Sequence, residues 1–306
     1  MGKKIYVETF IKAPIDSVWE YTQNPQLHQQ WDLRFSEINY LPKVNEQDRQ
    51  KFLYRTNIGF GLSIAGEGES YGTKEVDGVR TSSLVFGTEQ RISLIELGSG
   101  FWRYIPKNGG VTFLTLYDYR TRFGWLGRYF DSIVFRPMIG WATAWSFDAL
   151  RLWLELGIHP RSSILRCLRY WIVSIVLCFL WVYQGLVPKL LFANTGELEL
   201  ISQIGLFRGY EPSVLAIAGV LEILFGLTFL FIRKRNKLLH YINIFLLIGL
   251  LLSGMAFPSV FLAPFNPITL NGAMIALSAT QLLENEQLAT AKNCLRTERR
   301  GEEGEL

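Results

Sequence analysis

The chain has 306 residues, of which 49% are hydrophobic, and it has a formal net charge of +4. Its mean hydropathy of +0.17 is apolar for a soluble protein, and the small excess of Lys and Arg gives little support to nucleic-acid binding. Three cysteines without a Cys-x-x-Cys pair and three scattered histidines make no zinc or iron–sulfur pattern. We therefore expect no metal site, no nucleic-acid partner and no catalytic residue.

The first residues predict a strand followed by two short helices. Met1 to Lys4 lead directly into the alternating segment 5–11 rather than into an apolar signal segment, which indicates a domain kept in the cytoplasm. A helix is expected to begin near Pro14, with Asp16 as its cap, and a second helix to cover Gln26–Trp31.

The next part of the chain predicts antiparallel strands and then one long helix. Seven strand-like blocks are separated by Gly, Asp-Gly and Asn-Gly turn signals, with Gly66 and Gly68 interpreted as turn or bulge glycines. The blocks are 37–41, 51–58, 62–71, 80–86, 91–97, 101–105 and 111–119. The amphipathic helix covers about Leu126–Leu156, and Pro137 should kink or split it.

This order resembles the START-like (SRPBCC or polyketide-cyclase-like) family. The opening ETFIKAPIDSVWEYTQNPQLHQQWD is similar to the entry of that family, and the resemblance covers roughly residues 1–155. It implies an α+β helix-grip domain over residues 1–157, with a cavity for apolar or amphipathic ligands between sheet and helix. Aromatic residues either line such a cavity or fill the core, and the candidate lining residues are Phe52, Tyr54, Phe86, Trp102, Tyr117, Trp141 and Trp145.

Residues 158–169 form a basic linker, and the chain is expected to be turn-like at 157–163. Four apolar stretches follow. Each stretch is long enough to cross about 30 Å of hydrocarbon as a helix. The predicted spans are 170–192, 212–232, 239–257 and 264–283. Lys and Arg collect before the first span, at Arg233–Lys237 and after the fourth, which places both termini and the tail 286–306 in the cytoplasm. These basic residues bind anionic headgroups or serve as a topology signal alone.

Glu222 lies in the middle of the second predicted span. A carboxylate there is costly unless it faces the bundle or is neutral, so it is either a ligand-, ion- or proton-binding group or an interhelical hydrogen-bonding residue. Its expected partners on neighbouring spans are Gln184, Lys189 and Asn271. His240, at the start of the third span, is expected at the membrane interface.

The same region resembles the DoxX-like family of small four-helix membrane proteins. The resemblance rests on WVYQGLVPKL at 181–190, on Gly219–Glu222 and on PFNPITLNG at 264–272. It implies an all-α four-helix transmembrane bundle over residues 170–285. It also implies a link to quinone-dependent membrane redox complexes. The positions that match the family's pattern are Gln184, Lys189, Glu222, Pro264, Phe265, Asn266, Pro267 and Asn271.

Two hypotheses follow for a multi-pass protein of a bacterial inner or plasma membrane. In the first, the cytoplasmic domain binds a hydrophobic small molecule or lipid and couples it to the bundle, without a cofactor or catalysis. In the second, the chain is a subunit of a quinone-linked membrane oxidoreductase, with a membrane redox partner and with Glu222 handling protons.

Overall fold

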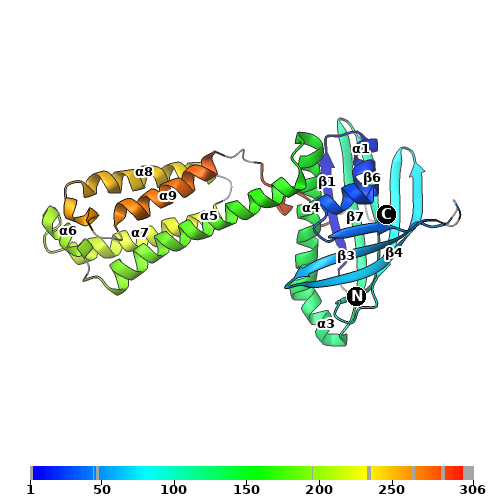
Figure 1. The fold of residues 1–306 in the computed structure, drawn as a ribbon, viewed down its shortest axis with the longest axis horizontal. Coiled ribbons are helices and arrows are strands. Elements are labelled where there is room, and N and C mark those ends of the chain that lie inside the picture. Colours follow the sequence, from blue (N-terminus) through cyan, green and yellow to red (C-terminus); the bar gives the residue numbers. More distant parts are fainter. Residues whose placement is uncertain are drawn as a thin grey trace. The chain divides into compact units, whose positions relative to one another are not determined.

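The computed structural model describes residues 3–43, 45, 48–194, 196–232, 236–262, 266–283 and 287–298. The chain forms two compact units (Figure 1). One consists of Met1–Leu165 together with Gln287–Leu306, and the other of Arg166–Glu286. The first unit is therefore built from both ends of the chain.

The first unit contains one seven-stranded antiparallel sheet with the order β1-β7-β6-β5-β4-β3-β2. Along the chain, helices α1 (Ile15–Gln23) and α2 (Pro25–Trp31) come between β1 and β2. The strands are β1 (Ile5–Ile11), β2 (Glu37–Tyr40), β3 (Lys51–Gly59), β4 (Leu62–Val76), β5 (Val79–Gly87), β6 (Ile95–Lys107) and β7 (Gly110–Thr121). Every pair is antiparallel, as the alternating sequence pattern predicted.

Two predicted strands, 91–97 and 101–105, are wrong as separate elements. Residues 91–94 form a turn, and one continuous strand, β6, begins at Ile95. Gly98, which suggested a turn, lies inside β6, where a Cβ atom would be 2.4 Å from the Phe86 ring. Gly66 and Gly68 likewise lie within β4, under the rings of Tyr54 and Phe52. These glycines leave room for aromatic rings that lie flat across the neighbouring strand.

The long helical segment after the sheet is split, as Pro137 predicted. Helix α3 (Gly124–Phe130) leads into a π-helical turn, η1 (Asp131–Phe135), and then into α4 (Arg136–Leu156), which has the proline in its first turn. The predicted cap of α1 is wrong. Pro14 occupies that position, and the Asp16 carboxylate instead lies 2.6 Å from Arg80 Nη1.

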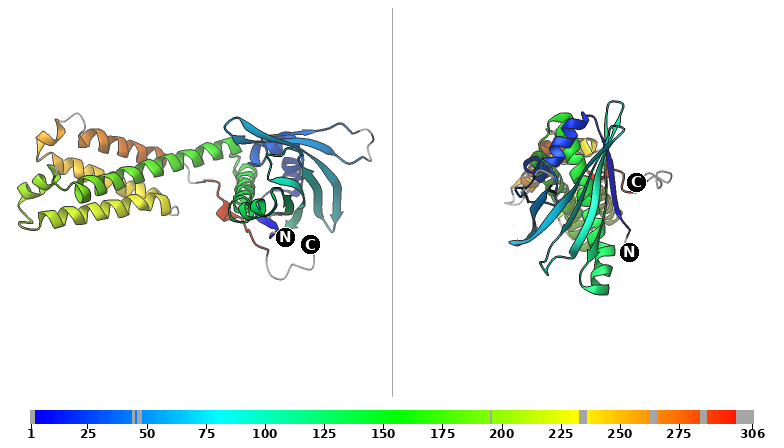
Figure 2. Two further views of the ribbon diagram at one scale, coloured as in Figure 1. Left: turned by 90° about the horizontal axis from the view of Figure 1, so that it is seen from below. Right: turned by 90° about the vertical axis from the view of Figure 1, so that its right-hand side faces the viewer.

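Helix α4 lies along the concave side of the curved sheet, which is the helix-grip arrangement (Figure 2). Phe113 of β7 and Phe147 of α4 stack with their ring centroids 4.4 Å apart, and both are fully buried. Trp31 at the end of α2 packs edge-on against Phe147. This aromatic core holds α2, α4 and the middle of the sheet together.

The C-terminal segment returns to this unit, which the sequence did not predict. Leu295 pairs with Glu8 of β1 through two backbone hydrogen bonds of 2.9 Å. Asp148 of α4 accepts hydrogen bonds from Thr290 N and Asn293 Nδ2. Residues 287–290 are extended, and a short 3-10 turn, η4 (Ala291–Asn293), follows. The far end of the predicted tail, 299–306, lies outside the described residues.

The second unit is helical. It contains α5 (Pro160–Leu186), the π-helical turn η2 (Val187–Leu191), α6 (Gly196–Ile204), α7 (Glu211–Phe231), α8 (Asn236–Gly254), the 3-10 turn η3 (Pro258–Phe261) and α9 (Pro267–Leu282). Among the described residues, three helices are long and apolar enough to cross a membrane: Pro160–Leu191, Glu211–Phe231 and Asn236–Gly254. The expected turn at 157–163 is confined to its start, because α5 begins at Pro160.

Candidate functional site

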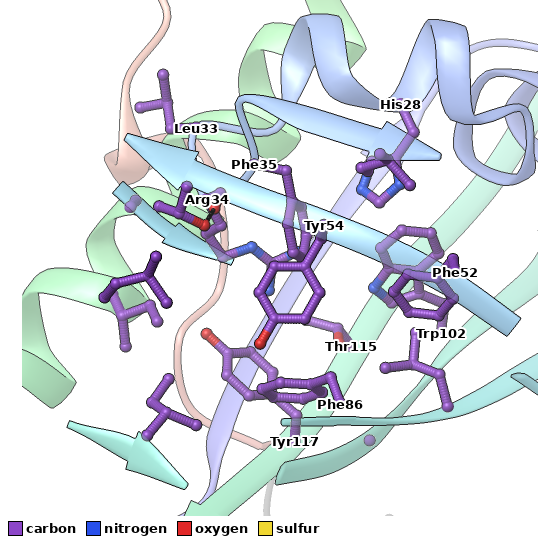
Figure 3. A pocket seen from close by; sticks show the side chains of 18 of the residues that line it. His28, Leu33, Arg34, Phe35, Phe52, Tyr54, Phe86, Trp102, Thr115 and Tyr117 are labelled. Atoms are coloured by element: carbon purple, nitrogen blue, oxygen red, sulfur yellow. Dashed lines mark hydrogen bonds between the residues drawn. The ribbon is translucent and has the colours of Figure 1, made fainter. Parts of the chain in front are cut away.

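A cavity of about 420 Å³ lies between the concave face of the sheet and the helices of the first unit. Alternate residues of β3, β5, β6 and β7 point into it because side chains along a strand alternate between the two faces. The end of α2, η1 and the first half of α4 close the other side. Figure 3 shows the rings of Tyr54, Phe86 and Tyr117 around this space, with Arg34 beside them.

Six of the seven aromatic residues chosen from the sequence line this cavity: Phe52, Tyr54, Phe86, Trp102, Tyr117 and Trp141. Trp145 does not belong to the lining and is buried elsewhere on α4. Every residue of α4 from Thr143 to Leu150 is buried, because the sheet covers one side of the helix and the C-terminal segment contacts it at Ala144 and Asp148. The helix therefore lacks a single inward face in this part.

A charged cluster borders the apolar cavity at the end of α2. Arg34 donates hydrogen bonds from Nε and Nη2 to the Asp32 carboxylate, at 2.8 and 2.6 Å. His28 Nε2 lies 3.1 Å from the same carboxylate, and the Asp32 side chain is completely buried. His28 and Asp32 are four residues apart at the end of the helix, so they lie on one face.

The cluster contains one negative and one positive charge. Burial would raise the pKa of Asp32, but Arg34 and His28 outweigh it and hold the pKa well below its ordinary value. Burial also lowers the pKa of His28 more than Asp32 raises it, so the imidazole is neutral at pH 7. Burial alone would lower the pKa of Arg34, but the attraction of Asp32 is larger, so the pKa of Arg34 lies above its ordinary value. The cluster is therefore electrically neutral overall.

The other polar groups of the lining are bonded within the domain. The Tyr117 and Thr143 hydroxyls lie 2.9 Å apart, and Tyr54 donates its hydroxyl proton to the Gly87 carbonyl. The Arg34 guanidinium also interacts with Tyr117, with its Cζ atom 5.4 Å from the centre of the Tyr117 ring. The sequence analysis did not predict the cluster of Arg34, Asp32 and His28. The four-residue spacing of His28 and Asp32, next to Trp31, could have predicted that these two side chains lie together.

In the second unit, the structure brings together two of the residues predicted to interact. Lys189 Nζ lies 2.9 Å from Glu222 Oε2 and 2.8 Å from Glu197 Oε2. It also lies within hydrogen-bonding distance of the Gln184 backbone carbonyl, at 3.3 Å, while Glu197, from α6, was not predicted. A lysine that is only 9% exposed is thus surrounded by oxygen atoms.

Two glycines place this ion pair. A Cβ atom at Gly185 of α5 would lie 2.3 Å from the Gly219 carbonyl oxygen, and one at Gly219 of α7 would lie 2.6 Å from the Gly185 oxygen. The two helix backbones therefore touch, as small residues permit in membranes. Lys189 follows Gly185 by one turn and Glu222 follows Gly219 by one turn, so the close approach sets the two charges side by side.

The remaining predicted polar residues lie elsewhere. Asn271 is buried on α9 and makes no hydrogen bond or ion pair with Lys189 or Glu222 in the described part of the chain. Asn266 caps α9 through its side chain, and Pro267 begins that helix. Pro264 and Phe265 of the family pattern lie outside the described residues.

His240, which is expected near the membrane interface, is fully buried among the helices of this unit. Its Nδ1 atom lies 3.1 Å from Ser278 Oγ. Asn243 donates a hydrogen bond to the same hydroxyl and accepts one from Trp181 Nε1. This network fastens α5, α8 and α9 to one another.

The sequence of the helical unit matches a known family of membrane proteins. Residues 178–279 match the model of the DoxX-like family. The chain is 44% identical over 242 residues to the uncharacterized membrane protein YndG of Bacillus subtilis (strain 168), covering 78% of this chain and 81% of YndG. The chain belongs to the family of YndG. It is a membrane protein with a DoxX-like domain, and the resemblance stated from the sequence is confirmed.

Solved structures with similar folds include an aromatase/cyclase and a lipid-transfer protein. The Zhui aromatase/cyclase from Streptomyces sp. R1128 is 12% identical, with a TM-score of 0.37, over 51% of this chain and 97% of its own. The STAR-related lipid transfer protein from Xanthomonas axonopodis is 18% identical, with a TM-score of 0.35, over 48% and 82%. The protein TTHA0849 from Thermus thermophilus is 12% identical, with a TM-score of 0.36, over 45% and 87%.

Proposed function

We propose that the START-like domain binds a hydrophobic small molecule or lipid in its cavity and couples this binding to the DoxX-like bundle. The observation that carries the proposal is the cavity of about 420 Å³ between sheet and α4. Its size falls within the range of about 300–1,000 Å³ that is typical of small-molecule sites. Its walls are mainly aromatic and aliphatic, which favours an apolar ligand.

The charged cluster at the cavity suggests how such a ligand is oriented. Arg34 and Asp32 neutralise each other, and His28 is neutral, so an anionic ligand gains little net attraction there. A carbonyl, ester or hydroxyl oxygen can accept a hydrogen bond from Arg34 Nη1 without adding charge to a buried site. We therefore favour an uncharged, oxygen-bearing end on an otherwise apolar molecule.

Coupling is supported by the position of α4. Ile139 and Ala142 of α4 line the cavity, while Ala144 and Asp148 hold the C-terminal segment that follows α9. A ligand that displaces α4 would also displace the C-terminal segment bound to it. Because this segment continues directly from α9, the displacement could reach the last helix of the bundle.

We propose an even number of membrane spans on the basis of the first unit. Residues before 166 and after 286 fold into one body. Because one folded body lies on one side of a membrane, the segment between them crosses it an even number of times. With α5, α7 and α8 as spans, α9 is the fourth. Its 16 residues reach about 24 Å, which requires local thinning of the bilayer. The basic flanks support a cytoplasmic position for both termini in this proposal.

Native mass spectrometry of the full-length protein in mild detergent, with extraction of bound small molecules, tests ligand binding. Ala142→Phe fills the cavity, and Lys74→Phe places the same side chain on the exposed, far part of β4 as a matched control. The proposal expects a defined apolar molecule on wild type and on Lys74→Phe, and its loss from Ala142→Phe. Equal retention in both variants would place the molecule elsewhere.

A second candidate function is a subunit of a quinone-linked membrane oxidoreductase. It is supported by the buried pair of Lys189 and Glu222, because charged groups inside membrane segments are costly and commonly serve function. A quinone that is retained by the wild type and lost specifically in Glu222→Gln would favour this function over the first. If Glu222 only holds the bundle together, Glu222→Gln should be tolerated and Glu222→Leu should loosen the bundle.

A further inference from the structure

The first unit exposes an unusual number of apolar side chains around the entrance of the cavity. Between positions 123 and 141, nine apolar residues are exposed, including Trp125 at 69% and Tyr129 at 65%. They lie at the N-cap of α3, on α3, on η1 and on the first turns of α4. A water-facing surface of this kind is rare on a domain without a partner.

A second apolar element is the turn between β3 and β4. Phe60 at its tip is completely exposed and lies between two glycines, with Ile58 and Leu62 exposed on either side. Its φ of 51° is in the left-handed region, which a bulky residue seldom adopts. Phe123, at the start of the helical segment, is also exposed, with a φ of 67°. Two phenylalanines with a backbone in the left-handed region are thus presented outward.

The two elements border one opening. Ile58 and Ile64 from the hairpin line the cavity, as do Met138 and Trp141 from α4. We call the exposed apolar residues 58, 60 and 62, together with those of 123–141, the mouth surface. Ile58, Met138 and Trp141 thus belong both to the mouth surface and to the lining of the cavity.

The charge of the helical part is suited to a lipid headgroup region. Its acidic residue, Asp131, is buried and paired with Arg136 at 2.8 Å, whereas Arg128 is exposed. Arg136 also donates a hydrogen bond to the Lys3 carbonyl, so the exposed Lys3 and Lys4 lie beside it. This surface combines Trp and Tyr with Arg and Lys and has no exposed acidic residue in the helical part. Such a composition favours the interface of an anionic membrane.

We propose that the mouth surface docks on the lipid bilayer in which the helices of the same protein are inserted, so that the cavity opens toward lipid rather than toward water. This goes beyond ligand binding, because it assigns a second membrane-contacting surface to the cytoplasmic domain. Its partner is the headgroup region of an anionic bilayer. Phe60 and Trp125 would insert among the headgroups, where their exposed area is removed from water.

The test uses the full-length protein in vesicles of phosphatidylethanolamine and phosphatidylglycerol. Cys167, Cys178 and Cys294 are replaced, and single cysteines are introduced by Phe60→Cys, Trp125→Cys or Asp77→Cys and labelled with an environment-sensitive fluorophore. Asp77 is the control, because it is exposed at the other end of β4, about 46 Å away along a 15-residue strand. Nitroxide-labelled phospholipid in the bilayer then quenches those labels that touch lipid.

We expect quenching at positions 60 and 125 to exceed that at position 77 by about twofold or more, and Arg128→Glu to reduce it. Equal quenching at all three positions, or none at 60 and 125, would overturn the proposal. The readout requires no bound ligand, so an empty cavity and an undocked mouth surface are distinguished. All three cysteine positions are exposed, which keeps the fold intact in each variant.

Discussion

Replacing Arg34 by Met tests whether the charged cluster stabilises the cavity wall. The change removes the two guanidinium hydrogen bonds to Asp32 and leaves a carboxylate with a completely buried side chain. Removal of one partner of a buried ion pair costs about 3–5 kcal/mol. His28 Nε2 and the Arg34 backbone amide remain 3.1 Å from the carboxylate, so we expect the lower end of this range.

The size of the first unit converts this free energy into a shift in melting temperature. For a domain of 150–250 residues, each kcal/mol lowers the Tm by roughly 2–4 °C, so Arg34→Met should lower it by about 6–12 °C. Unfolding of this unit can be followed by alkylation of Cys294, which lies in the C-terminal segment and is buried against Ala144 of α4, in a protein with Cys167 and Cys178 replaced.

Two further variants make the result interpretable. Asp32→Leu combined with Arg34→Met removes both charges and should recover most of the lost stability, because no unpaired charge remains. Arg55→Met removes an exposed arginine at 3.9 Å from Glu37 and should change stability by less than about 1 kcal/mol. An unchanged Tm for Arg34→Met, or an equal loss for Arg55→Met, would refute the reasoning.

The remaining predictions concern pH, helix contact and the C-terminal segment. The pKa of Asp32 in the folded protein is below its ordinary value of 3.8, so the ionised carboxylate stabilises the fold fully above pH 3.8 and less as the pH falls below it. The Tm difference between wild type and Asp32→Asn should therefore shrink from pH 7 to about pH 3. Gly219→Val should separate α5 from α7 and lower the thermal stability of the bundle, measured by size-exclusion after heating, whereas Gly249→Val, with no atom within 4 Å of its Cβ, should not. Burial raises the pKa of Cys294 to about 12, so maleimide should label it slowly, and Asp148→Ala should accelerate labelling by releasing Thr290 and Asn293; equal rates would contradict the docked segment.

The sequence predicted those elements whose signals are local. Alternation over residues 5–11 marks β1, Asp77-Gly78 marks the turn before β5, and Pro137 marks the break before α4. Apolar blocks likewise predicted α5, α7 and α8 within a few residues of their observed starts or ends. Such signals need no knowledge of which segments meet in space.

The errors arise where a distant partner decides the structure. Gly98 interrupts a strand pattern, yet it belongs in β6 because the Phe86 ring from β5 covers it. Leu295 pairs with Glu8 at the other end of the chain, and nothing near either residue announces this contact. His240 lies 3.1 Å from Ser278 of α9, and nothing near either residue in the sequence predicted this contact.

The candidate sites show the same limit. Six of the seven aromatic residues chosen from the sequence line the cavity, five of them on strands that share one inward face and one, Trp141, on α4. The cluster of His28, Asp32 and Arg34 was missed because its importance depends on burial beneath the sheet. The pairing of Lys189 with Glu222 was anticipated, whereas Glu197 joined them through α6, a helix that the loop sequence did not suggest.

Photo-crosslinking from inside the cavity tests the central claim most directly. Benzoylphenylalanine in place of Phe86 puts a reactive ketone among the lining residues, and the same group in place of Lys74 faces outward. After irradiation of cells that produce the full-length protein, ligand binding predicts a discrete small-molecule mass adduct on the peptide that contains position 86 and none on the control. The absence of an adduct at position 86, or the same adduct at both positions, would contradict the account.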